Sequence, residues 1–85
     1  MKVLVTGTAG FIGMKTTEFL LRDGAEVVGI DNLNNYYDIG LKRYRLNQLQ
    51  AFPNFKFYKL DIENREALNR LFTKHKPQAV INLAA

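Results

Sequence analysis

The sequence contains no cysteine and no serine, and these two absences exclude several kinds of chemistry. Without cysteine there are no disulfides and no thiolate nucleophiles, and without serine there is no serine nucleophile. His75 is the single histidine. It falls at the expected end of a helix, where we interpret it as a cap for carbonyl groups rather than a catalytic base. Asp61 and Glu63 have no third ligand near them in sequence, so we expect no metal site.

Long apolar runs are also missing. None approaches the ~20 residues of a membrane-spanning helix, and no signal-peptide pattern begins the sequence, so we expect a cytoplasmic protein without membrane contact. Excess charge is mild, because 12 Lys and Arg against 8 Asp and Glu give +4 without a dense basic block. We interpret these charges as a solvated surface that gives some help to anionic ligands, and we infer no nucleic-acid site. The alternation in Phe55–Lys59 is better explained by a strand than by an RNA-binding surface.

Three glycines at a spacing of three, Gly7, Gly10 and Gly13, are the most informative feature that is present. They follow the apolar run Val3–Val5 and open an amphipathic stretch. Between a strand and a helix, such a turn lets the backbone approach a pyrophosphate, and the helix N-terminus offers free N–H groups to an anion. A Gly-rich turn without a chemical role is the alternative, and context decides between the two.

Asp31 supplies that context, because it ends a second apolar run, Glu26–Ile30. A carboxylate at the tip of the second strand can accept from both ribose hydroxyls of an adenosine and repels a 2′-phosphate, which favours NAD over NADP. Lys42 and Arg43 weaken this preference, since a basic group can meet a 2′-phosphate. The alternative for Asp31 is a strand-end residue that caps a turn.

The 85 residues allow one domain at most, and strand and helix patterns alternate along them. We predict strands at 2–6, 26–30, 56–60 and 79–83, helices at 11–23, 41–51 and from Asn64 to Lys76, and a long loop at 32–40. The predicted inner faces are Ile12, Phe19 and Leu20 in the first helix, Leu41, Tyr44, Gln48 and Leu49 in the second, and Ala67, Leu68, Leu71 and Phe72 in the third.

This alternation predicts an α/β, Rossmann-like half-domain, with a parallel four-stranded sheet in the order 3-2-1-4 and three helices. Ligands of such a fold bind at the carboxyl ends of the strands. Gly7, Asp31, Asp61 and Leu83 all map to that edge, although they come from four separate parts of the sequence.

The whole sequence resembles the N-terminal part of the extended short-chain dehydrogenase/reductases. The motifs are V-T-G-T-A-G-F-I-G, V-V-G-I-D-N-L-N-N-Y-Y-D, L-K-R-Y-R-L, L-D-I and V-I-N-L-A-A. Within that family it is most similar to the NAD-dependent nucleotide-sugar epimerases, and closest to UDP-glucuronate 4-epimerases. The D-N-L-N-N-Y-Y-D segment followed by L-K is the most specific to that subgroup.

The resemblance implies NAD as cofactor and a role for each matching residue. The pyrophosphate would lie on Gly7, Gly10, Phe11, Ile12 and Gly13, and the adenosine ribose near Asp31, Asn32 and Asn34. Asp61 and Ile62 would flank the adenine, and Leu83, Ala84 and Ala85 would line the path to the nicotinamide ribose.

Three departures from the family pattern stand out. Met14-Lys15-Thr16-Thr17 replaces the usual Ser, His and apolar residues, and we expect Thr16 to carry a hydroxyl into the core. Asn82 stands where many relatives have His. The family's chemistry needs a Tyr with a Lys four residues on, and no Tyr here has one, so we expect no catalytic residue in this chain.

Two functions remain open at this point. Residues 1–85 can be a partial NAD(P)-binding Rossmann domain, the NAD-binding N-terminal half of a nucleotide-sugar epimerase or dehydratase that is not catalytic alone. The alternative is a non-catalytic module that forms a homodimer through the open, apolar edge of the fourth strand.

Overall fold

Four strands and three helices alternate along the chain in the predicted order. The computed structural model describes residues 1–33 and 39–84. For Ile39 it describes the backbone and not the side chain. The elements are β1 (Lys2–Thr6), α1 (Phe11–Arg22), β2 (Glu26–Asp31), α2 (Ile39–Gln50), β3 (Phe55–Lys59), α3 (Arg65–His75) and β4 (Ala79–Asn82). The predicted boundaries of the first strand agree with these, and those of the other elements differ by at most two residues. Asn34 and Ala85 lie outside the described residues.

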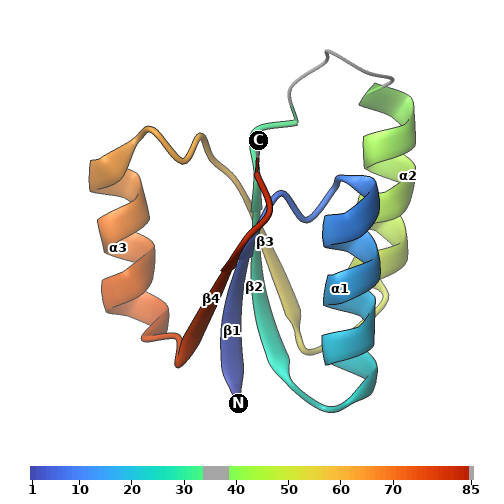
Figure 1. The fold of residues 1–85 in the computed structure, drawn as a ribbon, viewed down its shortest axis with the longest axis horizontal. Helices are drawn as coiled ribbons and strands as arrows, with labels where there is room; N and C mark the ends of the chain where they lie inside the picture. The colour runs from blue at the N-terminus through green and yellow to red at the C-terminus, as the bar shows by residue number, and fades with distance from the viewer. Residues whose placement is uncertain (34–38, 85) are drawn as a thin grey trace.

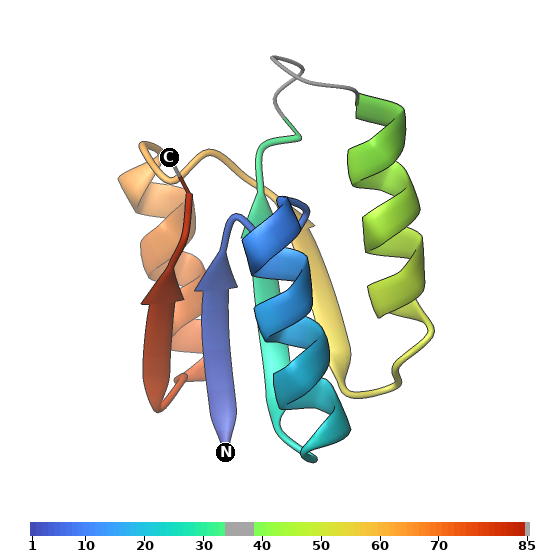
Figure 2. The ribbon, with the colours of Figure 1, turned by 45° about the vertical axis from the view of Figure 1, so that its right-hand side comes forward.

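The strands form one parallel sheet in the order β3-β2-β1-β4, which confirms the predicted fold class. In the central register, Val5 of β1 lies opposite Gly29 of β2 and Ile81 of β4. Helices α1 and α2 cover one face of the sheet and α3 covers the other (Figure 1). The turned view in Figure 2 shows all four strands running in one direction, so their carboxyl ends meet at one edge.

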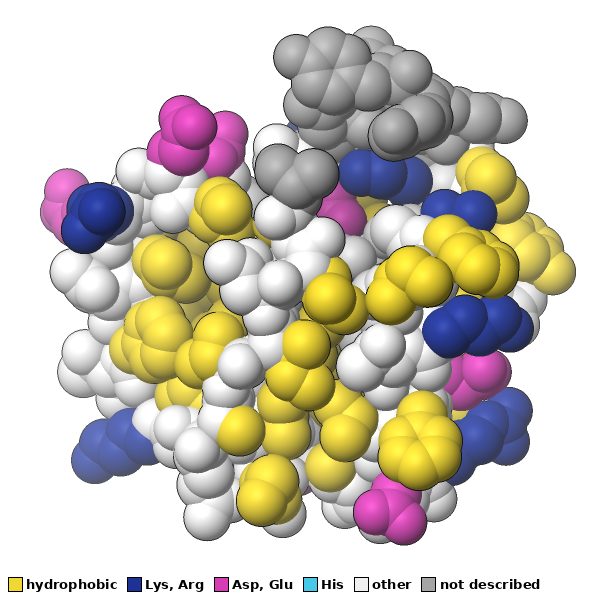
Figure 3. All heavy atoms as spheres, in the orientation of Figure 1, with side chains coloured by type: hydrophobic (Ala, Val, Ile, Leu, Met, Phe, Trp, Pro, Cys, Tyr) yellow, Lys and Arg dark blue, Asp and Glu magenta, His cyan; other side chains and the backbone are white. Residues whose placement is uncertain are grey.

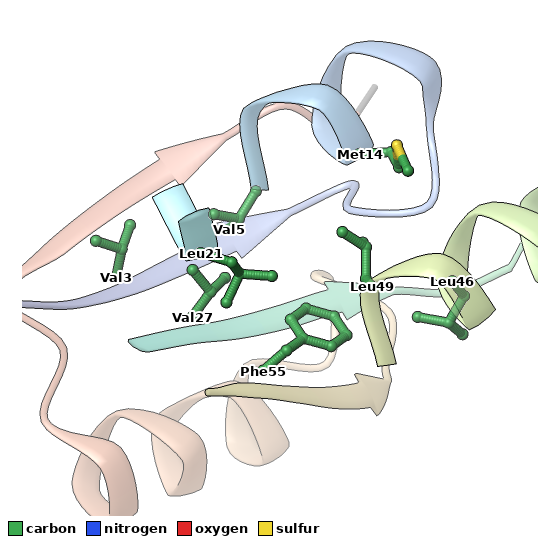
Figure 4. Packing of buried hydrophobic residues seen from close by; sticks show 8 residues of the cluster. All are labelled: Val3, Val5, Met14, Leu21, Val27, Leu46, Leu49 and Phe55. Carbon is green, nitrogen blue, oxygen red and sulfur yellow. The ribbon is translucent and has the colours of Figure 1, made fainter. Parts of the chain in front are cut away.

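Both faces of the sheet bury apolar side chains. The larger cluster joins β1, β2 and β3 to α1 and α2 and consists of Val3, Val5, Met14, Leu21, Val27, Leu46, Leu49 and Phe55 (Figure 4). The smaller cluster, on the α3 side, consists of Leu4, Val28, Ile30 and Leu71. Because helices cover both faces, β1 and β2 read as continuous apolar runs and not as alternating ones.

The predicted inner face of α1 is wrong in part. Ile12 and Phe19 are 60% and 71% exposed, and only Leu20 packs partly against the core. The buried residues of this helix are Gly13, Met14, Thr17 and Leu21. Thr17, and not Thr16, carries the buried hydroxyl. The physical reason is the contact between Gly13 and Gly7 in the turn after β1. This contact fixes the rotation of the helix about its axis.

The predicted face of α2 needs a similar correction. Leu46 and Leu49 are buried, whereas Leu41, Tyr44 and Gln48 are exposed. The side of α2 that carries Leu41 belongs to a pocket and not to the core.

Helix α3 agrees with the prediction at its start and differs at its end. The Asn64 side chain caps it by accepting from the Ala67 N–H at 3.2 Å. Leu71 is buried and the other predicted residues of its face are half-buried. His75 does not cap carbonyl groups. It is buried, and its Nε2 lies 2.8 Å from the hydroxyl of Tyr58 on β3.

Among the described residues, no helix combines the length and the hydropathy that crossing a membrane requires.

Candidate nucleotide-binding site

A pocket of about 870 Å³ opens at the carboxyl ends of the strands. The residues that line it come from the ends of all four strands and from α1 and α2. Every described residue of the predicted site lines it, namely Gly7, Gly10, Phe11, Ile12, Gly13, Asp31, Asn32, Asp61, Ile62, Leu83 and Ala84. The topology thus brings together residues as far apart in the sequence as Gly7 and Ala84.

Gly7 forms the turn that leaves β1, with a φ of +76°. Its N–H donates to the carbonyl of Ile30 at 2.7 Å, which ties the turn to the end of β2. On the other side, a Cβ on Gly7 would lie 2.9 Å from backbone atoms of Leu83 and Ala84. The turn therefore fits between the ends of β2 and β4 only because residue 7 has no side chain.

Gly13 packs the first turn of α1 directly on that strand turn. A Cβ on Gly13 would lie 1.9 Å from the carbonyl oxygen of Gly7, so no larger residue fits without a backbone shift. Gly10 caps the helix in an extended conformation, and its N–H donates to the same Gly7 carbonyl at 3.1 Å.

The N-terminus of α1 faces the pocket without a side-chain cap. The capping residue, Gly10, has no side chain that could accept a hydrogen bond, and the first turn of α1 contains no acidic residue. The first N–H groups of a helix have no partner within it, and they carry the positive end of its dipole. Phe11, Ile12 and Gly13 thus present a region that favours an anion.

The Asp31 carboxylate lies at the end of β2 with its side chain only 4% exposed. Its Oδ2 accepts from the Ala9 N–H at 3.0 Å, and its Oδ1 accepts from the Leu33 N–H at 2.8 Å. Oδ1 also lies 3.3 Å from the ammonium of Lys42 on α2. The carboxylate therefore joins the glycine turn, the end of β2 and α2 at one point.

The sequence prediction missed most of the α2 wall. Leu41, Lys42 and Arg45 line the pocket, whereas Arg43 is exposed and does not. The Arg45 guanidinium donates to the Ala9 carbonyl at 3.3 Å and lies 5.7 Å from the centre of the Phe11 ring. Arg45 follows Leu41 by four residues and Lys42 by three, and both spacings place it beside them on the helix surface, which is the signal that could have found this wall.

Asp61 and Ile62 form the opposite wall, after β3. The Leu60 N–H donates to the Asp31 carbonyl at 3.1 Å, which holds the ends of β3 and β2 together. The Asp61 carboxylate accepts from the Glu63 N–H at 2.9 Å. Ile30, Leu60 and Glu63 also line the pocket, and each is a chain neighbour of a predicted residue.

The Thr6 hydroxyl fixes the end of β4. It donates to the Asn82 side-chain oxygen at 2.5 Å and accepts from the N–H groups of Leu83 and Ala84 at 3.1 and 3.3 Å. Thr6 was not predicted as a site residue, and it does not line the pocket itself. It holds in place two residues that do, Leu83 and Ala84.

His75 is not among the pocket residues. Burial lowers the pKa of its imidazole, and the nearby ammonium groups of Lys2, Lys74 and Lys56 lower this pKa further. Within residues 1–33 and 39–84, no three His, Asp or Glu side chains form a group that could hold a metal ion.

Comparisons with known proteins show which proteins this chain is similar to. UDP-glucuronate 4-epimerase of Thermodesulfobacterium geofontis is 55% identical over 82 residues, which cover 96% of this chain and 25% of that protein. Protein CapI of Staphylococcus aureus is 44% identical over 85 residues, covering 100% and 25%. The chain therefore spans about a quarter of the length of these relatives.

The fold comparison agrees. UDP-glucuronic acid 4-epimerase of Bacillus cereus, solved in complex with NAD, superposes with a TM-score of 0.88 at 37% identity. The match covers 100% of this chain and 27% of that one. The family model described as GDP-mannose 4,6 dehydratase matches residues 4–85. The chain therefore belongs to the GDP-mannose 4,6 dehydratase family, and its resemblance to the N-terminal part of the extended short-chain dehydrogenase/reductases is confirmed.

Proposed function

We propose that the pocket binds NAD and that this chain is the NAD-binding N-terminal part of a nucleotide-sugar epimerase. One observation carries the proposal: the Asp31 carboxylate and the N-terminus of α1 line the same pocket. An acid at one side and an uncapped helix N-terminus at the other match the ribose and the pyrophosphate of an adenine dinucleotide. The similarity to an epimerase solved with NAD supports the same ligand.

The pyrophosphate would lie on the glycine turn, against Gly7, Gly10, Phe11, Ile12 and Gly13. Two features of the turn support this role. The N-terminus of α1 has no side-chain cap to compete with an anion. The glycines keep the floor of the pocket free of side chains, so that a phosphate can approach the backbone N–H groups.

Asp31 would accept hydrogen bonds from the adenosine ribose, with Asn32 beside it and Asn34 beyond the described residues. A carboxylate offers about four acceptor positions, and three are occupied here, by Ala9, Leu33 and Lys42. Among the described residues no other group donates to this carboxylate, and a second position opens when the Lys42 ammonium moves. This capacity fits the two hydroxyl groups of a ribose.

Asp61 and Ile62 would flank the adenine, because they form the wall opposite α2. Leu83 and Ala84 would line the path toward the nicotinamide ribose, followed by Ala85, which lies outside the described residues. Bound NAD would supply the hydride acceptor of the reaction. The chain would supply binding and orientation, since none of its tyrosines is followed by a lysine four residues on.

The reaction we propose for the whole enzyme is 4-epimerisation of a UDP-sugar acid. The relatives named UDP-glucuronate and UDP-glucuronic acid 4-epimerase support this substrate class.

We also propose that two copies pair through the outer edge of β4. Among the described residues, β4 pairs only with β1, and Val80 is 48% exposed. Figure 3 shows the side of the molecule on which β4 lies, with hydrophobic side chains over its middle and charged side chains at its rim. The opposite edge strand, β3, carries Lys56 and Lys59, which discourage pairing, whereas β4 carries no charge. Sedimentation velocity tests this, and a monomer at high concentration contradicts it.

Calorimetric titration with NAD and with ADP-ribose tests the cofactor site. We expect both to bind with similar affinity, because the contacts described here reach the adenosine and the pyrophosphate. Asp31→Ala should remove most of this binding. Asp23→Ala is the matched control, since Asp23 is exposed at the far end of α1. If Asp31→Ala and wild type bind NAD equally well, the ribose assignment is wrong.

A further inference from the structure

The basic side chains on α2 carry an inference that rests on the proposed NAD site. We propose that Lys42 is a specificity-determining residue, because its ammonium partly neutralises the carboxylate that repels a 2′-phosphate. The degree to which this site rejects NADP would then depend on the Asp31–Lys42 pair and not on Asp31 alone.

The first support is the burial of the pair. The Lys42 Nζ lies 3.3 Å from the Asp31 Oδ1, and the two side chains are only 15% and 4% exposed. Charges so poorly exposed are screened less by water and salt than a surface pair. A change of charge at Lys42 therefore changes the electrostatic potential at any group bound beside Asp31.

The second support is that Asp31 is held by backbone groups as well as by Lys42. The backbone N–H groups of Ala9 and Leu33 donate to the two carboxylate oxygens at 3.0 and 2.8 Å. These bonds orient the carboxylate from the protein backbone. Removal of the Lys42 ammonium therefore alters the electrostatic potential at the ribose position while the acid stays where it is.

The third support is a second cation on the same wall. Arg45 follows Lys42 by three residues and also lines the pocket. Its guanidinium is held by the Ala9 carbonyl and lies near the Phe11 ring. On this side of the pocket one acid, Asp31, thus lies with two bases, Lys42 and Arg45. The other acids of the pocket, Asp61 and Glu63, follow β3. When the charge of Asp31 is removed, the two cations remain, and they favour the binding of a phosphate.

The test compares NAD and NADP, which differ only by the 2′-phosphate. Calorimetric titration of wild type, Lys42→Met, Asp31→Asn and the double variant gives the ratio of NADP to NAD affinity for each. Asparagine removes the charge and keeps one side-chain oxygen, so it can accept from one of the two backbone N–H groups, Ala9 or Leu33, that donate to Asp31. Arg43→Met is the matched control, because Arg43 is exposed on the same helix and does not line the pocket.

We expect Lys42→Met to lower the NADP-to-NAD ratio about three- to tenfold, because the Asp31 charge is then unopposed. Asp31→Asn should raise the ratio by about tenfold or more, since a charge-assisted bond from Lys42 to the phosphate becomes available. Adding Lys42→Met to Asp31→Asn should remove most of that gain. Arg43→Met should leave the ratio within about twofold of wild type, as its charge lies on the exposed side of α2.

An unchanged ratio in Lys42→Met, in both backgrounds, overturns the inference while the NAD site stands. An equal effect of Arg43→Met also overturns it, because the effect is then one of general charge. If wild type binds neither dinucleotide, the proposed function fails, and this inference fails with it. If circular dichroism shows that Asp31→Asn does not fold, Lys42→Met in the natural background decides alone.

Discussion

The carbonyl oxygen of Gly7 lies 1.9 Å from the point that a Cβ on Gly13 would occupy. Two glycines of the turn are thus in direct contact, one at the end of β1 and the other in the first turn of α1. This contact sets both the height of α1 above the sheet and its rotation. The glycine spacing that indicates a nucleotide site is therefore also a packing requirement of the fold itself.

Gly13→Ala should destabilise the chain by about 1–3 kcal/mol or more, because the backbone of α1 has to move away from β1. The midpoint of urea unfolding measures this loss. Gly24→Ala is the comparison, since nothing lies within 4 Å of its Cβ position and only its φ of +92° is unfavourable. If Gly13→Ala costs no more than Gly24→Ala, the contact has been overestimated.

This same contact explains where sequence reasoning failed. The apolar pattern of α1 points to Ile12 and Phe19 as its inner face, and both are exposed. Once Gly13 must face Gly7, positions one and two turns later, Thr17 and Leu21, must face the sheet as well. Hydrophobicity alone does not contain this information, because a glycine and a threonine do not count as core residues in an apolar pattern.

Thr17→Val should stabilise the chain by about 1 kcal/mol. The Thr17 side chain is completely buried, and its hydroxyl has no hydrogen-bond partner among the described residues. Valine has nearly the same shape and removes a polar group that water no longer reaches. Thermal unfolding measures the gain. Thr16→Val, at the half-buried neighbouring position, is the control and should change stability by much less. A destabilised Thr17→Val variant would show that this hydroxyl has a partner.

The site was more predictable than the helix faces. Parallel strands bring their carboxyl ends to one edge, so a correct strand order was enough to unite Gly7, Asp31, Asp61 and Leu83 in one pocket. The pocket residues that were missed, Leu41 and Arg45, come from a helix. Their place in the pocket depends on the rotation of α2, which its weak apolar pattern does not fix.

Thr6→Val should loosen the end of β4. The Ala84 N–H has the Thr6 hydroxyl as its acceptor, whereas the Leu83 N–H also donates to the Thr6 carbonyl. Amide hydrogen exchange should therefore accelerate more at Ala84 than at Leu83, and little in β2. Thr6→Ser keeps the hydroxyl and should keep the wild-type exchange rates. Equal acceleration at both amides would contradict the separate roles assigned to the hydroxyl and the carbonyl.

Stability should fall as the pH drops below about 6.5, the usual pKa of histidine. Burial, together with the ammonium groups of Lys2, Lys74 and Lys56, lowers the pKa of His75 in the folded chain. The unfolded chain therefore binds the proton first, and folding loses free energy from about pH 6.5 down to the lower folded pKa. Above pH 6.5 both states are neutral and this contribution is constant. Urea midpoints between pH 5 and 8 measure the slope, and His75→Gln should flatten it within this window. A variant that keeps the full slope would assign the pH dependence to other groups.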